Sequence, residues 1–169
     1  MIIKCIRSTT VALSTILVLF AGLSFGSESK YEEGKHYAKL STPIQTEDPK
    51  KIEVTEYFSY GCPHCFRFEG LISQWRSQLE TDIVFKRSPA IWNVPGYQVF
   101  ARTYYTLESL GVLPDLHLQI FRAIHNNGRR LETIEKMTEF VAEYGVDPEK
   151  FLRTYNDSFG VKAKYQRAL

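Results

Sequence analysis

Two cysteines, Cys62 and Cys65, stand where a predicted strand gives way to a predicted helix, and this arrangement limits the fold more than any other part of the sequence. Residues 52–58 alternate between apolar and polar side chains, which is typical of a half-buried strand. After the cysteines, apolar residues recur at helical spacing, which predicts a helix over about 63–79, and a second strand follows at 83–87. The order of strand, Cys-x-x-Cys, helix and strand predicts a βαβ unit and an α/β fold, with the dithiol at the strand-to-helix junction.

The rest of the chain is predicted to be helical. Apolar residues recur at helical spacing in four segments, at 97–110, about 114–126, 133–144 and from Asp147 onward. Upstream of the first strand, residues 27–51 are polar and irregular, with one short strand expected at 37–40. We therefore divide the chain beyond its first 26 residues into 27–96, which carry the cysteine motif, and 97–169, which are all helical.

Residues 1–26 are typical of a secretory signal peptide. A basic start with Lys4 and Arg7 precedes an apolar stretch over 11–21, and small residues occupy the −3 and −1 positions of a cleavage site that ends at Gly26. The apolar stretch is shorter than a retained membrane helix requires. We expect the chain to be exported and cleaved after about Gly26.

Cleavage would leave Cys62 and Cys65 as the only cysteines, because Cys5 lies in the leader. A secreted protein stabilised by disulfides usually joins distant parts of its chain, since closing a long loop removes more entropy from the unfolded state. A bridge between Cys62 and Cys65 closes a loop of only four residues. We therefore interpret the pair as chemical rather than structural.

The position of Cys62 favours its thiolate, the form that attacks disulfides. The free N–H groups and the positive end of the predicted helix point at its sulfur, and His64 can add positive charge or a hydrogen bond. These effects predict a pKa of about 3.5–7.5 for Cys62, below the ordinary value of about 8.5. Since a stabilised thiolate favours the reduced protein, the disulfide form is predicted to be a strong oxidant, with Cys65 as the resolving thiol.

A structural zinc site is the alternative interpretation of a Cys-x-x-Cys motif, and it needs four ligands. The exported chain has no second cysteine pair, His36 is isolated, and His117 and His125 are eight residues apart on a predicted helix, a poor spacing for ligands. We expect no metal and no cofactor, and we interpret the two later histidines as ordinary surface or helix-packing residues. Without the leader, acidic and basic residues are equal in number, which argues against nucleic-acid binding.

Glu56 shares a strand face with Val54 and Phe58, so it is a candidate buried acid. Burying a carboxylate is costly, and such residues are often functional because a raised pKa lets them exchange protons. Strand parity alone leaves a second interpretation open, in which Glu56 lies at the edge of the sheet and reaches water.

On these residues the chain resembles the DsbA family of bacterial periplasmic dithiol oxidases, which belongs to the thioredoxin superfamily. The resemblance covers nearly all of the exported sequence, and its most specific part is residues 56–66, Glu-Tyr-Phe-Ser-Tyr-Gly-Cys-Pro-His-Cys-Phe. Further segments that carry it are 31–37, 107–112 and 145–159. The Pro63-His64 pair inside the dithiol is specific for this family, since thioredoxins typically have Gly-Pro there and disulfide isomerases Gly-His.

The resemblance implies a thioredoxin-like fold with an all-helical domain inserted after the βαβ unit. It implies that Cys62 is the attacking thiol, that His64 stabilises its thiolate and that Cys65 is the resolving thiol. It also implies that Glu56 is a buried acid that helps Cys65 lose its proton, with Lys86 as a candidate neighbour of that acid. The implied partners are reduced, unfolded exported proteins and a membrane quinone-linked reoxidase of the DsbB type, and we expect a periplasmic monomer.

The sequence departs from the family in its C-terminal part. In the family, the helical insert is followed by two strands and a last helix, with a cis-proline loop facing the dithiol, whereas here the last proline is Pro148 and the sequence ends at Leu169. We therefore expect the final strands and helix of the fold to be missing from this chain. The leading hypothesis is an exported dithiol oxidase. A periplasmic reductase or isomerase of the same fold, and an inactive truncated remnant that binds peptides, stay open as alternatives.

Overall fold

The computed structural model describes residues 30–169. The predicted signal peptide and its cleavage site lie outside the described residues. The chain divides into two compact units, Met1–Ile44 and Gln45–Leu169. Among the described residues, none of the helices combines the length and the apolar character that crossing a bilayer requires.

Residues 30–44 of the first unit hold an isolated parallel bridge between Glu33 and Tyr37. The strand predicted at 37–40 is not formed, so this prediction is wrong. The physical reason is a local turn at Gly34, which has a φ of 83° and whose N–H donates to the carbonyl of Tyr37 at 2.7 Å. The turn uses backbone groups that a strand would offer to a neighbour.

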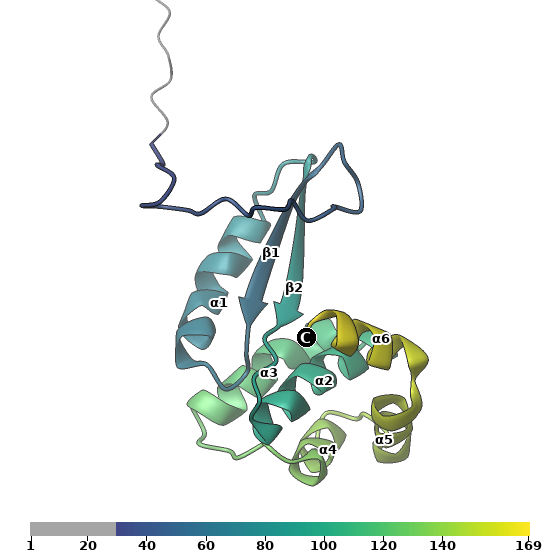
Figure 1. Ribbon diagram of the computed structural model, residues 1–169. Helices are drawn as coiled ribbons and strands as arrows, with labels where there is room; N and C mark the ends of the chain where they lie inside the picture. The colour runs from purple at the N-terminus through teal and green to yellow at the C-terminus, as the bar shows by residue number, and fades with distance from the viewer. Residues whose placement is uncertain (1–29) are drawn as a thin grey trace, which may run out of the picture. The chain divides into compact units, whose positions relative to one another are not determined.

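The second unit begins with the predicted βαβ unit. Strands β1 (Ile52–Phe58) and β2 (Ile83–Pro89) are parallel and paired along their whole length. Helix α1 (Pro63–Arg76) connects them and lies along the two strands (Figure 1). Because the sheet of the described residues has only these two strands, the residues that are buried as a whole lie at their ends, at Phe58 and Pro89, and most other strand residues are half-buried.

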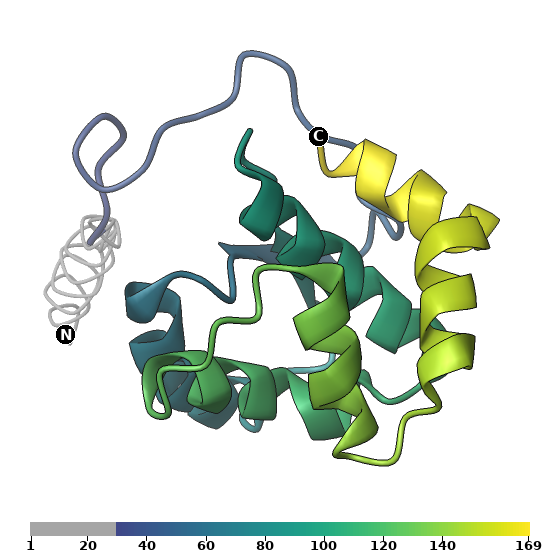
Figure 2. The ribbon, with the colours of Figure 1, turned by 90° about the horizontal axis from the view of Figure 1, so that it is seen from below.

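Five further helices follow, with α2 at their centre. They are α2 (Pro95–Leu110), α3 (Leu113–His125), α4 (Ile134–Ala142), α5 (Pro148–Asp157) and α6 (Phe159–Arg167). Helix α2 packs against α3, α5 and α6 (Figure 2). The helices gather at the carboxyl ends of the strands, the end that leads into α1 (Figure 1). The predicted α/β class, with a helical part after the βαβ unit, is confirmed.

Short-range signals set most helix boundaries. Gly111 ends α2 with a φ of 74°, and the side chain of Thr133 caps α4 by accepting from the N–H of Lys136. The break between α5 and α6 was not predicted. Ser158 makes it, because its extended backbone ends α5 and its hydroxyl accepts from the N–H of Val161 to start α6.

The hydrophobic core lies among the helices and includes the residues at the carboxyl end of β1. Its fully buried members include Phe58, Tyr60, Leu107, Ile120, Phe121, Met137, Phe140 and Phe151. The ring of Phe121 on α3 lies 5.0 Å from that of Tyr60 and 5.9 Å from that of Phe58, centroid to centroid. The segment that leads into the dithiol is therefore anchored in the helical core.

Candidate functional site

Cys62 precedes the first turn of α1, and its sulfur caps that helix. Its backbone is extended, with φ −92° and ψ 113°, and its Sγ accepts a hydrogen bond from the N–H of Cys65 at 3.3 Å. Pro63 starts the helix, where a missing N–H costs nothing. The N–H of Cys62 donates to the carbonyl of Ser59 at 3.0 Å and fixes the preceding turn. The sulfur therefore lies where the free N–H groups of the helix converge.

The two cysteines are free thiols and differ in acidity. Burial acts to raise the pKa of Cys62, but hydrogen bonds from the side chain and backbone of Cys65 and from the backbone N–H of His64 outweigh it, so the pKa lies below its ordinary value. Burial and the hydrogen bond with Cys62 raise the pKa of Cys65 to about 11. This difference is what an attacking thiol and a resolving thiol require.

His64 is exposed, and Arg67 engages its ring from one turn further along α1. Nη2 of Arg67 lies 2.8 Å from Nδ1 of His64. In the structure, His64 favours the Cys62 thiolate through its backbone N–H, and the positive charge that lowers the pKa of Cys62 belongs to Arg67. The sequence predicts either a positive charge or a hydrogen bond from His64, and it gives no signal for Arg67.

Replacing Arg67 by Gln will raise the pKa of Cys62, because the substitution removes the charge and keeps a side chain of similar length. We expect a rise of less than about one pKa unit, since an exposed charge pair contributes at most ~1 kcal/mol. Ultraviolet absorbance of the thiolate across a pH titration measures the change. Arg153→Gln on α5 is the matched control, and an unchanged pKa in Arg67→Gln would contradict the prediction.

Gly61 allows α2 to approach the turn before Cys62. A Cβ at Gly61 would lie 3.0 Å from ring carbons of Tyr97, closer than ordinary van der Waals contact. Tyr97 in turn contacts Trp92, with 4.8 Å between ring centroids, and about half of the Trp92 side chain is exposed. Tyr97 of α2 therefore lies against the turn that precedes the dithiol.

Glu56 is buried, and its partner is Arg87. Its Oε2 accepts from Nε of Arg87 at 2.8 Å, and the two side chains are 9% and 10% exposed. Nη2 of the same guanidinium donates to both carboxylate oxygens of Glu69, at 2.9 and 3.0 Å. One guanidinium thus joins β1, β2 and α1. Burial does most to raise the pKa of Cys65, and the charge of Glu56 adds to it, so this acid lies within electrostatic reach of the resolving thiol.

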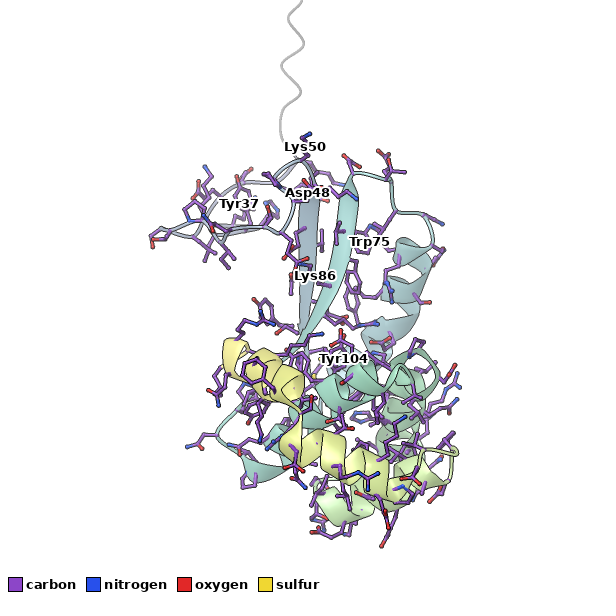
Figure 3. The ribbon with its side chains drawn as sticks, turned by 90° about the vertical axis from the view of Figure 1, so that its right-hand side faces the viewer. Tyr37, Asp48, Lys50, Trp75, Lys86 and Tyr104 are labelled. Atoms are coloured by element: carbon purple, nitrogen blue, oxygen red, sulfur yellow. The ribbon has the colours of Figure 1, made fainter. Side chains whose placement is uncertain are left out.

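The prediction that Lys86 neighbours Glu56 is wrong, because Lys86 lies on the other face of the sheet. The preceding residue, Phe85, contacts Trp75 of α1 with 5.8 Å between ring centroids, and successive side chains of a strand point to opposite faces. Figure 3 labels Lys86 and Trp75 in a side view. The Nζ of Lys86 pairs with Glu53 at 2.7 Å.

His117 and His125 make polar contacts that the sequence analysis missed. His117 is buried, with Nδ1 2.9 Å from the hydroxyl of Tyr60 and Nε2 3.1 Å from Oε1 of Glu69. Nε2 of His125 lies 2.8 Å from the carbonyl oxygen of Tyr60. Both rings also pack against Phe121, at 5.4 and 6.1 Å between ring centroids, so they are helix-packing residues that make polar contacts in addition. In residues 30–169, no group of three or more His, Cys, Asp or Glu is arranged to hold a metal ion.

One further signal in the sequence could have revealed part of this cluster. Glu69 and Ile72 are the two buried residues of α1, so Glu69 is an acid on the face that packs inward. An acid on a buried face requires a partner. The sequence does not identify that partner, because Arg87 lies 18 residues away and His117 lies 48 residues away.

Comparisons with known proteins agree with this geometry. No protein-family profile matches the chain. It is 47% identical over 142 residues to the thiol:disulfide interchange protein DsbA of Pseudomonas aeruginosa PAO1, covering 82% of this chain and 64% of the relative. It is 38% identical over 169 residues to the DsbA of Azotobacter vinelandii, covering 98% of this chain and 76% of the relative. The chain thus spans just under two thirds of the Pseudomonas relative.

Solved structures show the same relationship. The crystal structure of Pseudomonas aeruginosa DsbA matches with a TM-score of 0.75 and 46% identity, over 82% of this chain and 71% of that chain. The structure of oxidoreductase DsbA from Xylella fastidiosa matches with a TM-score of 0.65 and 34% identity, over 71% of this chain and 65% of that chain.

Proposed function

This chain belongs to the DsbA family of thiol:disulfide interchange proteins, and on that premise we propose that it donates a disulfide to reduced exported proteins. The unequal acidity of two thiols within one helical turn carries the proposal. The pKa of Cys62 is lowered by hydrogen bonds that outweigh its burial, and the pKa of Cys65 is raised, chiefly by burial, to about 11. A thiolate stabilised in the folded, reduced protein favours reduction of the Cys62–Cys65 disulfide, so the disulfide form is an oxidant.

The direction of the pKa shift fixes how this oxidising tendency depends on pH. Because the folded pKa of Cys62 lies below its unfolded value, the stabilisation of the reduced form is fully present above the unfolded pKa. It is lost as the pH falls through the folded pKa, where Cys62 takes up a proton. The Cys62–Cys65 disulfide is therefore a weaker oxidant in acid, where its advantage over the disulfide of an ordinary dithiol is lost.

Disulfide transfer takes two exchange steps. A substrate thiolate attacks Sγ of Cys62, the bond to Cys65 breaks, and Cys65 leaves with the electron pair and takes up a proton. A second substrate thiolate attacks the substrate sulfur of the mixed disulfide, and Cys62 leaves as its thiolate. The substrate loses two electrons and the dithiol gains them. A leaving thiol of low pKa makes the second step fast.

The same proposal includes location and partners. The basic start and apolar stretch of residues 1–26 support export to the periplasm, with cleavage after about Gly26. A chain that its substrate has reduced needs an oxidant to form the Cys62–Cys65 disulfide again. We assign this role to a membrane quinone-linked reoxidase of the DsbB type. The working unit is a monomer that needs no bound cofactor, because both exchange steps use the Cys62–Cys65 pair alone.

A redox titration tests the proposal. The chain is equilibrated with glutathione buffers, the free thiols are trapped by alkylation, and the two states are counted by mass. We expect a potential near about −120 mV, the value of a characterised DsbA. Cys65→Ser, which cannot close the disulfide, is the control.

The other outcomes separate the alternatives. A potential near about −270 mV, as in thioredoxin, would make the protein a reductase. Absence of exchange with glutathione would leave the peptide-binding remnant as the better interpretation. Either result would overturn the oxidase proposal.

A further inference from the structure

Two histidines of helix α3 contact Tyr60, the residue two positions before Cys62. One contacts its hydroxyl and the other its carbonyl oxygen. Nδ1 of His117 lies 2.9 Å from the Tyr60 hydroxyl, and Nε2 of His125 lies 2.8 Å from the Tyr60 carbonyl oxygen. The tyrosine side chain is fully buried. Both polar ends of one buried residue are therefore held by one helix.

The same two histidines also contact α1 beyond the dithiol. The ring of His125 stacks on Phe66, the residue after Cys65, with 5.3 Å between centroids and 13° between planes. Nε2 of His117 lies 3.1 Å from Oε1 of Glu69, one helical turn after Cys65. Helix α3 thus contacts the chain on both sides of the Cys-x-x-Cys motif.

The hydrogen-bond partners of His117 and His125 show which ring nitrogen carries a hydrogen. A carbonyl oxygen only accepts, so His125 carries a hydrogen on Nε2. Burial raises the pKa of Tyr60 well above its ordinary value, so its hydroxyl keeps its proton and donates to Nδ1 of His117. Burial acts to raise the pKa of Glu69, but His117 and Arg87 lower it, so the carboxylate accepts from Nε2 of His117.

We propose that His117 and His125 are positioning residues for the dithiol, which hold residues 59–62 so that the N–H groups of the first turn of α1 point at the Cys62 sulfur. The inference rests on the proposed function and deepens it, because it assigns two residues outside the Cys-x-x-Cys motif to the same site. Both histidines act through Tyr60 and α1.

The fixed turn matters because hydrogen bonds to a thiolate depend on direction. The N–H of Cys65 reaches Sγ of Cys62 at 3.3 Å, so a small displacement of the turn weakens this contact. Only the reduced protein carries the thiolate. A looser turn therefore shifts the redox equilibrium toward the disulfide, whereas a purely structural role would lower the stability of both redox forms alike.

Substitution of each histidine by an apolar residue and by glutamine tests the inference. We expect His117→Leu and His125→Leu to lower the equilibrium constant for reduction of the disulfide by glutathione by about threefold to tenfold, the factor for partial loss of one hydrogen bond. Glutamine at position 125 should restore most of the loss, because its amide keeps a donor near the former Nε2. His117→Gln should restore only part of it, because the donor to Glu69 is kept but the Nδ1 that accepts from Tyr60 is not replaced. Tyr60→Phe, which removes only the hydroxyl, should shift the equilibrium in the same direction by at least about twofold. His36→Leu, in the first unit, is the matched control and should change nothing.

Titration of the thiolate by ultraviolet absorbance gives a second readout that needs no oxidase activity. We expect the pKa of Cys62 to rise in both leucine variants. Leucine variants that lose stability but keep the wild-type redox equilibrium and thiolate titration would show the histidines to be structural, and the inference would be wrong. If the leucine variants fail to fold, an unchanged Tyr60→Phe protein overturns it instead. A wild-type chain that does not exchange with glutathione defeats the proposed function, while the thiolate titration still decides the role of the histidines.

Discussion

At pH 7, an alkylating reagent will modify Cys62 at least about tenfold faster than Cys65 in the reduced protein. With a pKa of about 11, Cys65 is a thiolate in only about one molecule in ten thousand at this pH. A thiol with a pKa of 9.0 is a thiolate about a hundredfold more often than Cys65 at this pH, and the pKa of Cys62 lies below 9.0. The greater intrinsic reactivity of the more basic thiolate cancels about tenfold of this advantage.

Mass spectrometry of peptides after brief alkylation measures the two rates. The variants Cys62→Ser and Cys65→Ser serve as matched controls, because each presents one of the two thiols with a hydroxyl in place of the other. Cys65→Ser should react quickly and should accumulate mixed disulfides with substrate proteins. Equal alkylation rates in the two variants would remove the basis for calling Cys62 the nucleophile.

Replacing Arg87 by Met will lower the free energy of unfolding by about 3 kcal/mol. Removing one partner of a buried ion pair costs about 3–5 kcal/mol, because the remaining charge stays buried without a partner. Here two carboxylates, Glu56 and Glu69, lose their shared guanidinium. We expect the lower end of the range because Glu69 also lines a cavity of about 910 Å³, in which water can reach it.

Urea unfolding followed by circular dichroism measures this loss. Lys86→Met is the matched control: it removes a cation from the adjacent position of β2, but its ion pairs with Glu53 and Glu47 are both partly exposed to water, so their loss should cost much less. Combining Arg87→Met with Glu56→Gln and Glu69→Gln should recover much of the loss, since no buried charge is then left unpaired. Equal unfolding midpoints for Arg87→Met and Lys86→Met would show that the ion pairs of Arg87 with Glu56 and Glu69 do not stabilise the fold.

The elements that the sequence predicted correctly depend on short-range patterns. The alternation over 52–58 and the helical spacing after Pro63 each involve neighbours along the chain, and they placed Cys62 at the start of α1. The same holds for the end of α2 at Gly111, where glycine tolerates the left-handed backbone. Local geometry alone was enough to predict where the reactive sulfur lies.

The partners of the site could not be predicted because they depend on register and on distant packing. Glu56 lies opposite Arg87 only because β1 and β2 pair in one register, and a shift by one residue would have brought the Lys86 position to that face. Tyr60 and His117 are 57 residues apart, and nothing in the spacing of His117 indicates which element α3 packs against. Strand parity left two interpretations of Glu56 open, a buried acid and an acid at the sheet edge that reaches water, so both its burial and its neighbour required the three-dimensional structure.

Under the proposed function, the Cys62 sulfur that exchanges electrons with a substrate is also the hydrogen-bond acceptor that caps the start of α1. A thiolate accepts an N–H bond strongly, while a sulfur in a disulfide carries no charge and accepts weakly. A change of redox state is therefore expected to alter the strength of the hydrogen bond in the first turn of the helix, and the mobility of the backbone amides at its start should report the oxidation state of the pair.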